Sequence, residues 1–416
     1  MKPIALLIVG AGSRGTGYAE YALQHPDQAR VVGVVEPREY YRNQLARQHN
    51  IPPENVFTDW HPAANRPRFA DAVIIATPDA LHADPAVAFA NLGYHMLLEK
   101  PMAPTAAECR RIAAAVEANS ILFAVCHVLR YTTYTQKVKE IVESGRLGEV
   151  VSIQHLEPVG YWHQAHSFVR GNWRNESESS FMLLAKSCHD LDWIRYVVGK
   201  RCLRVSSFGN LHHFRKEEKP QGAADRCLDC SVETDCPYSA LKIYMGYLQR
   251  GELGWPVAML TPDVTEEGVM NALRTGPYGR CVYACDNDVV DHQVVNMLFE
   301  DGETAAFTMT AFNHQRDRET RIFGTRGELY GNGQVIEVFD FLTDTTDRID
   351  TWAGDGSILD GHGGGDYGLM RQFVAAVQQG DQSLIWSGLE ETLESHLMVF
   401  AAEEARRQNR VVEVEV

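Results

Sequence analysis

The sequence lacks any apolar run of the roughly 18–20 residues that a membrane-spanning helix requires. Residues 1–12 hold one lysine followed by an apolar stretch, and they resemble the start of a signal peptide. A glycine-rich turn stands where such a peptide would carry its small-x-small cleavage site. We therefore expect this stretch to form a buried strand, and we expect no membrane partner.

Cysteine and positive charge are also scarce. The 9 cysteines among 416 residues are too few for the disulfide framework of a small secreted protein, so we expect a cytoplasmic protein with reduced thiols. Lysine and arginine number 39 against 55 aspartate and glutamate residues, which gives a formal net charge of −16. Because such a surface repels phosphate backbones, we expect a small-molecule ligand and no nucleic-acid partner.

The remaining composition is that of a globular protein, with 45% hydrophobic and 23% charged residues. At about 100–200 residues per domain, the length predicts two or three domains. The pattern of the chain changes after residue 125 without a flexible linker or an internal repeat. We therefore predict a first domain over residues 1–125 and a second domain over residues 126–416.

The first domain alternates short apolar runs with amphipathic segments. The predicted buried strands are Ile4–Val9, Val31–Val35, Ala72–Ala76 and His95–Leu98. The helical patterns between them include Arg14–Gln24 and Asp84–Leu92. Strands separated by helices of this length predict βαβ units, and therefore an α/β fold with a doubly wound parallel sheet of the Rossmann type.

A glycine-rich turn joins the first strand to the first helix. It reads Gly10-Ala11-Gly12-Ser13-Arg14-Gly15, a G-x-G-x-x-G pattern. The first glycine makes the tight bend, the second lets the backbone approach a pyrophosphate, and the third allows helix and strand to pack closely. Glu36 ends the second strand, 21 residues after Gly15, where an acid binds the ribose hydroxyls of NAD. Arg38 leaves NADP open as the alternative, because it can pair with a 2′-phosphate.

Polar residues also follow the next two predicted strands, at the edge where doubly wound sheets bind ligands. Thr77 and Pro78 follow one strand, and Glu99 and Lys100 follow the other. A lysine beside the nicotinamide can bind a substrate hydroxyl and tune proton transfer as the hydride leaves. The alternative for Lys100 is a solvated surface cation.

Together these segments resemble the Gfo/Idh/MocA (glucose–fructose oxidoreductase/inositol dehydrogenase) family. The matching landmarks are Gly10–Gly15, Ala76-Thr77-Pro78 with His82, Glu99-Lys100-Pro101, Ser144–Val150 and Ile322–Gly327. The resemblance implies a Rossmann domain followed by an α/β domain with a large, mostly antiparallel open sheet. It also implies NAD(P)-dependent chemistry on a sugar, polyol or related carbonyl, with Lys100 as the catalytic lysine. The expected cofactor-binding residues are Gly10, Gly12, Ser13, Arg14, Gly15, Glu36, Arg38, Thr77, Pro78, His82, Glu99 and Lys100.

The second domain has the pattern of a one-sided sheet. Val150–Leu156 alternates like a half-buried strand, and a hairpin turn joins Val289–Phe299 to Thr304–Ala311. Helical patterns cover Tyr134–Glu143, Tyr367–Gln378 and Glu390–Arg407. Because such a sheet leaves one face exposed, we expect a homo-oligomer that forms through the C-terminal sheet.

The segment Phe181–Val198 predicts one continuous amphipathic helix. Its core face carries Leu184, Cys188 and Leu191, and its opposite face carries Lys186, His189 and Trp193. A single histidine is more often structural than catalytic, but a lysine on the same face leaves both roles open for His189.

The family motif in this segment is D-x-G-x-H-x-x-D. The chain matches it at His189 and Asp192, but Ala185 replaces the first aspartate and Ser187 replaces the glycine. The resemblance implies that His189 is the general acid/base on the substrate hydroxyl. The lost carboxylate indicates a divergent branch of the family.

Lys186 follows the lost carboxylate and is a third candidate catalytic residue. If it lies beside Lys100 and His189, three cationic groups converge and favour an anionic substrate. We therefore expect an acidic sugar as the preferred substrate. A solvent-facing Lys186 is the alternative.

Residues 161–174 are dense in His, Arg and Trp, a mixture that suits carbohydrate faces and anionic groups. The expected substrate-binding residues are Tyr161, His163, His166, Arg170, Trp173, Arg174, Asp192, His292 and His362. We favour substrate binding over a metal site for His163 and His166, because the sequence places no third ligand nearby. A solvated loop with incidental aromatic residues is the alternative.

A loop-rich insert at about residues 215–286 contains five cysteines. They are Cys227, Cys230 and Cys236, followed by Cys281 and Cys285. Four thiolates bind a structural zinc tetrahedrally, so we expect a zinc site whose fourth ligand is either Cys281 or Cys285. Buried or free cysteines are the alternative.

Three functions follow from these observations. The leading hypothesis is an NAD-dependent oxidoreductase in which Lys100 and His189 handle the hydroxyl proton of a sugar while hydride passes to the nicotinamide. The second is an NAD-dependent glycoside hydrolase that oxidises a sugar hydroxyl transiently and returns the hydride. The third is a non-catalytic NAD(H)-binding regulator.

Overall fold

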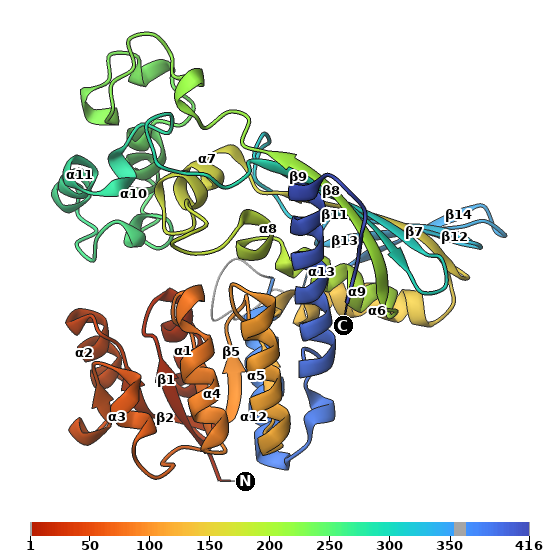
Figure 1. The fold of residues 1–416 in the computed structure, drawn as a ribbon, viewed down its shortest axis with the longest axis horizontal. Helices are drawn as coiled ribbons and strands as arrows, with labels where there is room; N and C mark the ends of the chain where they lie inside the picture. Colours follow the sequence, from red (N-terminus) through yellow and green to blue (C-terminus); the bar gives the residue numbers. More distant parts are fainter. Residues whose placement is uncertain (1, 353–362, 416) are drawn as a thin grey trace.

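The structure is a computed structural model that describes residues 2–352 and 363–415. Its first layer is a six-stranded parallel sheet in the order β3-β2-β1-β4-β5-β6 (Figure 1). The strands are β1 Ile4–Val9, β2 Ala29–Val35, β3 Val56–Phe57, β4 Ala72–Ile75, β5 His95–Leu98 and β6 Phe123–Val125. The helices between them are α1 Ser13–Gln24, α2 Glu39–Gln48, α3 Trp60–Ala64, α4 Ala83–Asn91 and α5 Ala106–Asn119. This strand order, which reverses at β1, confirms the predicted Rossmann type of sheet.

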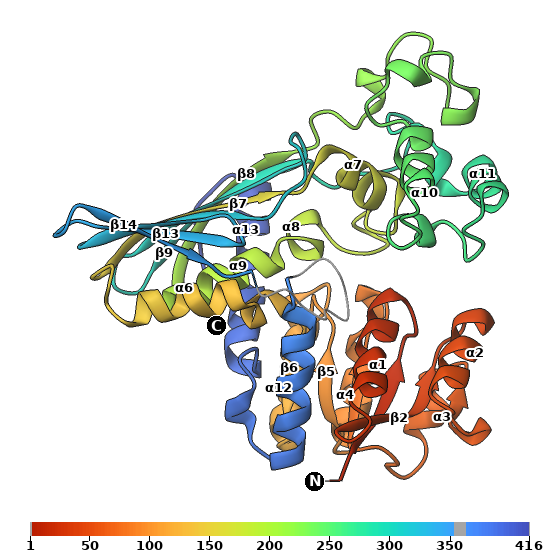
Figure 2. The same cartoon turned by 180° about the vertical axis from the view of Figure 1, so that it is seen from behind.

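The centre of this sheet shows why the sequence forms it. All six residues of β1 are buried, because the strand lies between β2 and β4 and is covered on both faces. A helix from near the end of the chain, α12 Gly365–Gln379, also packs against α1 and β1 (Figure 2). The two parts of the chain therefore share a core.

The second sheet has nine strands in the order β14-β13-β12-β11-β7-β10-β9-β8-β15. Its strands are β7 Val150–Pro158, β8 Cys202–Asn210, β9 His292–Phe299, β10 Thr304–Thr310, β11 Glu319–Gly324, β12 Gly327–Gly331, β13 Val335–Asp340, β14 Thr345–Asp350 and β15 Val412–Glu413. Neighbouring strands run antiparallel except for the parallel pair of β7 and β10. The predicted large, mostly antiparallel sheet is confirmed.

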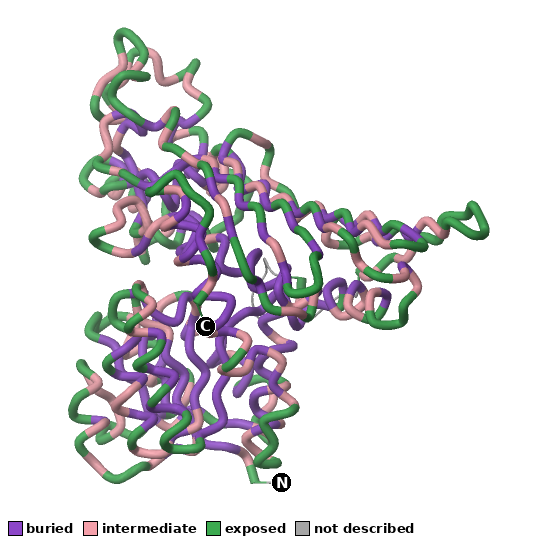
Figure 3. Tube along the Cα trace, turned by 45° about the vertical axis from the view of Figure 1, so that its right-hand side comes forward, coloured by how far each residue is buried: buried purple, intermediate pink, exposed green. Residues whose placement is uncertain are grey.

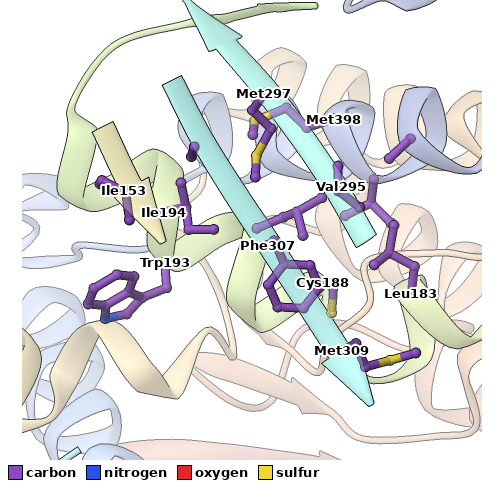
Figure 4. Packing of buried hydrophobic residues seen from close by; sticks show 14 of the residues in the cluster. Ile153, Leu183, Cys188, Trp193, Ile194, Val295, Met297, Phe307, Met309 and Met398 are labelled. Atoms are coloured by element: carbon purple, nitrogen blue, oxygen red, sulfur yellow. The ribbon is translucent and has the colours of Figure 1, made fainter. Parts of the chain in front are cut away.

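Three helices cover one face of the second sheet. They are α6 Thr133–Glu143, α9 Cys188–Val198 and α13 Leu389–Gln408 (Figure 2). Phe307 and Met309 of β10 lie against Leu183 and Cys188, as Figure 4 shows. This packing fixes the segment that carries the D-x-G-x-H-x-x-D positions onto the rigid sheet.

The opposite face of this sheet is open. Residues along β8, β9 and β10 alternate between buried and more exposed positions, in agreement with the predicted one-sided sheet (Figure 3). Phe208 of β8 is 56% exposed and pairs in register with the exposed Val294 of β9. The face therefore presents apolar side chains to its surroundings.

The predicted continuous helix over Phe181–Val198 is wrong. The segment forms two helices, α8 Met182–Ala185 and α9, with a break at Lys186 and Ser187. In a continuous helix the Ala185 carbonyl would accept a hydrogen bond from the backbone four residues later. It instead accepts one from Lys100 Nζ at 2.8 Å, so the ladder is interrupted there.

The break changes which side chains share a face. Leu184, Cys188 and Leu191 are buried in the core as predicted. Trp193 is not beside Lys186, because it stacks on the buried ring of His155 at 4.7 Å and lies within the core.

The insert between β8 and β9 is built from short helices and turns. It includes α10 Gly246–Gln249 and α11 Glu266–Thr275, and it lies next to α7, Tyr161–His163 (Figure 1). Two small apolar clusters hold it together and join it to Trp162, Ala165 and Val169 of the segment around α7. Within residues 2–352 and 363–415, no helix is both long enough and apolar enough to cross a membrane.

Candidate active site

The glycine-rich turn after β1 has the geometry of a phosphate cradle. Gly10 has φ +97°, and a Cβ there would lie 2.5 Å from the Ala76 carbonyl oxygen. A Cβ on Gly15 would lie 1.9 Å from the Gly10 carbonyl oxygen, so the helix packs directly on the turn. At Gly12, among the described atoms, a Cβ would meet only Arg38 Nη2, at 3.5 Å.

This open side of Gly12 faces the start of α1. Gly12 is the N-cap residue, and no side chain of the described chain caps the helix. The first N–H groups of a helix and its positive dipole end bind phosphate readily. The turn therefore fits the pyrophosphate of a dinucleotide, with Ser13 and Arg14 in the first turn of the helix.

Glu36 lies at the end of β2, beside this turn, where the sequence predicts a ribose-binding acid. Its Oε2 accepts hydrogen bonds from the Ala11 N–H at 2.9 Å and from Arg38 Nη2 at 3.0 Å. Arg38 Nε donates to Oε1 at 2.8 Å. Burial raises the pKa of Glu36, but the hydrogen bonds from Arg38 and Ala11 outweigh burial and lower it. The carboxylate is therefore ionised and partly covered by the guanidinium.

We expect Glu36→Ala to weaken NAD binding about 10–150-fold, because a hydrogen bond to a charged group contributes about 1.5–3 kcal/mol. The change also frees Arg38 to meet a 2′-phosphate, so the preference for NAD over NADP falls or reverses. Titration of both cofactors by protein fluorescence measures the two affinities. Glu39→Ala, an exposed change three residues later, is the control. An unchanged NAD-to-NADP ratio would contradict the assignment of Glu36.

His82 connects the loops that follow β4 and β5. Its ring is fully buried, with Nδ1 2.8 Å from the Pro101 carbonyl oxygen and Nε2 2.8 Å from the Thr77 carbonyl oxygen. Two backbone oxygens thus occupy both ring nitrogens. His82 therefore holds the loop that carries Thr77 and Pro78, and its contact with the cofactor stays a prediction.

Glu99 occupies a polar cluster under the phosphate turn. Arg14 Nε and the Tyr18 hydroxyl donate to its Oε1 at 2.5 and 2.8 Å, and the Lys100 N–H donates to its Oε2 at 2.8 Å. Burial raises the pKa of Glu99, but Arg14 and Lys100 outweigh burial and lower it. Arg14 also pairs with Asp366 of α12 at 2.5 Å. Glu99 therefore positions Arg14 and the backbone of Lys100.

Lys100 connects the first sheet to the second. It follows β5 at the carboxyl edge of the parallel sheet, and its Nζ donates to the carbonyl of Ala185 at the end of α8. His189 is buried on the first turn of α9, and its ring centroid lies 5.8 Å from that of His127. Burial lowers the pKa of His127 to about 3, and Lys100 contributes to that shift. The structure thus brings Lys100, His127 and His189 into one region.

Lys186 does not face solvent. Its Nζ lies 3.2 Å from Glu157 Oε1, and its side chain is 18% exposed. Burial lowers the pKa of Lys186, Glu157 raises it, and Arg318 and Lys100 lower it further. The solvent-facing alternative for Lys186 is wrong, because its side chain is enclosed and pairs with Glu157 of β7.

A buried group of charged residues surrounds Lys186, and this group was not predicted from the sequence. Arg318, which precedes β11, lies 2.8 Å from Glu157 Oε2 and 2.6 Å from Asp190 Oδ1. His155 Nε2 lies 3.3 Å from the same Asp190 oxygen. The sequence contains a weak signal, since His155 lies in the predicted strand Val150–Leu156 on the face of Ile153, and Glu157 follows that strand directly at the next alternate position.

Three of the predicted substrate ligands are engaged elsewhere. Asp192 is fully buried and accepts two hydrogen bonds from Arg130, at 2.8 and 2.7 Å. Arg170 donates to the carbonyls of Arg280 and Tyr238 inside the insert, each at 2.7 Å. These corrections share one cause, since each charge has a buried or loop partner that the linear sequence does not reveal.

Arg174 is the third engaged residue, because Asp286 of the insert accepts two hydrogen bonds from it at 3.0 Å each. Trp173 is half-buried against Phe168, with ring centroids 6.2 Å apart. Both residues therefore brace the loop after the π-helical segment Gln164–Arg170.

His163 of α7 lies close enough to Lys186 to feel its charge, whereas the Tyr161 ring packs edge-on against Tyr238 of the insert. Tyr161 is 37% exposed, whereas His163 is largely enclosed. Burial lowers the pKa of His163 well below its usual value, with Lys186 as the second cause. The ring of Trp255, from the insert, meets His163 edge-on at 5.0 Å. These positions remain compatible with substrate contact.

His292 and His362 were expected to close over the same pocket. His292 begins β9, and its side chain is 42% exposed. Its Nδ1 lies 2.9 Å from Asp291 Oδ1. His362 lies outside the described residues. Gly363 and Gly364 both have positive φ, and they lead directly into α12, which starts at Gly365.

His166 is enclosed by the insert. Its Nδ1 lies 2.9 Å from the Tyr244 hydroxyl, and its ring stacks on Tyr278 with centroids 4.9 Å apart. Burial lowers its pKa to about 3, and Arg170 contributes to the shift. His166 therefore anchors the insert as a neutral ring.

We expect the free energy of unfolding to decrease between pH 6.5 and pH 4, because His166 and His127 have native pKa values of about 3. The unfolded chain binds these protons near pH 6.5, whereas the native state does not, so stability rises with pH across this window. Urea unfolding at a series of pH values measures the slope. His166→Phe should flatten the slope, and the exposed His314→Gln should leave it unchanged. Equal slopes in all three proteins would contradict the burial of His166.

The cysteines of the insert gather at one pocket. Cys227, Cys230, Cys236 and Cys281 line a cavity of about 140 Å³ together with Arg170, whereas Cys285 donates to the Cys281 carbonyl at 3.3 Å. Within the described residues, no three or more His, Cys, Asp or Glu side chains are grouped to hold a metal ion. The expected zinc site is therefore not found, because the thiols line the cavity without converging on one point.

Two family models match this chain. The model described as the oxidoreductase family with NAD-binding Rossmann fold (Gfo/Idh/MocA) matches residues 4–127. The model of the C-terminal alpha/beta domain of the same family matches residues 139–414. Together they cover far more than half of the sequence.

Individual relatives are distant. The chain is 24% identical over 314 residues to YteT of Bacillus subtilis (strain 168), which covers 71% of this chain and 70% of that protein. It is 26% identical over 207 residues to 2,7-anhydro-N-acetylneuraminate hydratase of Escherichia coli (strain K12), covering 50% and 53%. The chain therefore spans about half the length of the second relative.

Solved structures resemble the whole chain. Levoglucosan dehydrogenase in complex with NADH and levoglucosan superposes with a TM-score of 0.73 at 18% identity, over 100% of both chains. An oxidoreductase domain protein from Kribbella flavida gives a TM-score of 0.74 at 17% identity, also over 100% of both chains. At this identity the likeness concerns the fold.

Proposed function

We propose that this chain, which belongs to the Gfo/Idh/MocA oxidoreductase family, transfers a hydride between a sugar or sugar derivative and NAD. One observation carries the proposal. Lys100 follows the parallel strand β5 beside the phosphate turn, and its ammonium reaches the carbonyl of Ala185 in the second-domain motif. A site at this junction presents both the cofactor and a substrate held by the larger sheet.

The residues around the glycine-rich turn would hold the cofactor. Gly12 and the start of α1 fit the pyrophosphate, and Glu36 with Arg38 fits the adenosine ribose. We propose NAD as the preferred cofactor, because the ionised Glu36 disfavours a 2′-phosphate. When bound, NAD supplies the hydride acceptor.

The protein side chains would manage the proton. The proton must leave the substrate hydroxyl as the C–H bond breaks, and a base with a pKa near neutrality is favoured for that step. We assign this step to His189, with Lys100 donating a hydrogen bond to the hydroxyl oxygen. Lys186 is the second cation of the site and is balanced by Glu157.

The ion pair between Lys186 and Glu157 removes part of the reason to expect an acidic sugar. The expected acidic sugar rested on three cations without a carboxylate, and Glu157 removes one unpaired cation from that count. The proposal therefore covers neutral and acidic sugars alike. A panel that contains both types compares them directly.

The proposed function is tested by mixing the protein with NAD and a panel of neutral and acidic sugars and following the absorbance of NADH. We expect NADH to accumulate with at least one sugar. Tight NAD binding without NADH from any sugar would count against net dehydrogenation.

The second candidate is a redox-neutral reaction that returns the hydride to the substrate. Two observations favour keeping it: the motif lacks its first aspartate at Ala185, and a relative with 26% identity is named a hydratase. It predicts NAD-dependent release of nitrophenol from an aryl glycoside without accumulation of NADH. Nitrophenol release that is independent of NAD would exclude it.

We also propose a homo-oligomer that forms through the open face of the nine-stranded sheet. The exposed Phe208 and Val294 support it, because they are cross-strand neighbours on this face and contiguous apolar side chains mark protein interfaces. Phe208→Asp should reduce the mass measured by light scattering, whereas Leu23→Asp on α1 should not. The nine cysteines, all in the described part of the chain, are free thiols, which supports a reducing compartment such as the cytoplasm.

A further inference from the structure

The site has a carboxylate that the motif does not encode. The family motif has an aspartate at the position of Ala185, and this chain instead has a helix break there. Lys186 turns toward β7, where Glu157 is 3% exposed. Glu157 is thus the carboxylate that faces the residue after the altered motif position.

We propose that Glu157 takes the place of the carboxylate missing at position 185, and that it positions Lys186 toward the substrate hydroxyl beside Lys100. The inference rests on the proposed function, because the hydroxyl belongs to the proposed sugar. Glu157 acts through Lys186 and is therefore a positioning residue.

The contacts of Glu157 support this role. Its Oε1 lies 3.2 Å from Lys186 Nζ. Its Oε2 lies 2.8 Å from Arg318 Nη2, yet neither of these two atoms has a hydrogen-bond partner of good geometry among the described residues. Burying a carboxylate costs several kcal/mol, roughly, unless it is well paired. A buried carboxylate with unused hydrogen-bonding capacity is typical of a functional site.

The charged residues packed around Lys186 all influence the pKa of its ammonium group. Glu157 comes from β7 and Asp190 from α9, and both favour the ammonium form. Burial, Arg318 and Lys100 disfavour that form. His163 of α7 also feels the charge of Lys186.

The effect of Glu157 on the protonation of Lys186 can be measured. Removing its negative charge leaves burial and two cations acting on Lys186, so the ammonium loses its proton at a lower pH. The ammonium then no longer donates a hydrogen bond to the substrate hydroxyl. The basic limb of the pH profile of kcat/KM should therefore move toward lower pH.

The test is Glu157→Gln, which keeps the shape and removes the charge. We expect kcat/KM to fall at least about tenfold, mainly through kcat, with the basic limb shifted down and NAD affinity unchanged. Glu319→Gln is the matched control, because Glu319 lies on β11 opposite Leu156, one residue from Glu157 along β7, and it faces Arg316 at 3.3 Å. The control should behave like the wild type.

A compensating change makes the test specific. Ala185→Asp restores the family carboxylate, and in the Glu157→Gln background it should recover most of the lost kcat and return the basic limb upward. Glu157→Asp should keep the position of the limb even if its kcat is lower. Loss of activity in Glu157→Gln with an unmoved limb and no recovery would overturn the proposal.

A second readout does not need turnover. Competitive acetylation with acetic anhydride, followed by peptide mass spectrometry, measures the pH at which Lys186 becomes reactive. Lys186 should become reactive at lower pH in Glu157→Gln than in the wild type. An identical reactivity profile would overturn the inference even if no sugar is oxidised, whereas a shifted profile without any turnover would count against the proposed function alone.

Discussion

Replacing Lys100 with methionine is expected to lower kcat by about 10²–10⁴-fold, because the proton transfer to His189 contributes about that factor and requires Lys100 to hold the substrate hydroxyl in place. Methionine keeps the length and apolar character of the side chain and removes the ammonium that donates to Ala185. NAD affinity should change little, since the phosphate turn and Glu36 are untouched. Steady-state kinetics with the best sugar of the panel and a fluorescence titration of NAD measure the two effects.

The control for this change is Lys216→Met, an exposed lysine of the insert. It should retain wild-type kcat. If Lys100→Met kept kcat within about threefold of the wild type, Lys100 would not be a catalytic residue and the proposed site would be wrong.

Replacing Asp192 with alanine is expected to cost about 3–5 kcal/mol of unfolding free energy, as removing one partner of a buried ion pair does. Arg130 is fully buried, and Asp192 accepts hydrogen bonds from both its Nε and Nη2. Without Asp192 the guanidinium would keep, among the described residues, Glu391 at 2.5 Å, the carbonyl of Trp386 and the ring of Tyr196. Denaturant unfolding of the two proteins at neutral pH measures the difference.

The exposed pair of Arg111 and Asp84 provides the control, since surface ion pairs contribute about 0–1 kcal/mol. Asp84→Ala should therefore stay within about 1 kcal/mol of the wild type. If Asp192→Ala also stayed within about 1 kcal/mol of the wild-type free energy of unfolding, the structural role assigned to Asp192 would be contradicted.

The same ion pair has a signature in the pH dependence. Burial raises the pKa of Asp192, but Arg130 and His127 outweigh burial and lower it below its usual value. The stabilisation by Asp192 is therefore complete above the unfolded pKa of about 3.9 and is lost as the pH falls through the native pKa. Asp192→Ala should remove this acid-dependent part of the stability.

The first sheet could be predicted from the sequence because its information is local. Ile4–Val9 is an uninterrupted apolar strand that leads directly into the glycine turn, and the structure has the strand with the same bounds. Gly15 is required by its contact with the Gly10 carbonyl oxygen and Gly10 by its φ of +97°, and both are features of the local turn. The alternation of strands and helices then predicts a parallel sheet, whereas the short strands β3 and β6 were not predicted.

The candidate site could be predicted only in part, because its decisive contacts join distant segments. Lys100 interrupts the predicted helix by hydrogen bonding to Ala185, and no local pattern encodes that contact. Glu157 and Arg318 reach Lys186 from β7 and from the segment before β11. Helical periodicity placed Trp193 beside Lys186, but packing against His155 in the core prevailed.

The roles of Arg170, Arg174 and the cysteines of the insert also could not be predicted from the sequence alone. Arg170 and Arg174 suited an anionic substrate by type, but carbonyls of the insert and Asp286 bind them in the structure. The cysteine spacing predicted a zinc site, and the described thiols share a cavity without forming one. Residue type and spacing therefore indicate candidates, whereas burial and partners decide their roles.

The central claim is that a sugar carbon and NAD exchange a hydride at the junction around Lys100. The most direct test is a single-turnover experiment with enzyme in excess over the sugar, in which the absorbance of NADH is followed over time. We expect NADH to form in the wild type and either to accumulate or to be consumed again. Lys100→Met should form NADH at least about a hundredfold more slowly. Absence of NADH at every time in an NAD-saturated wild-type protein, with every sugar of the panel, would contradict the central claim.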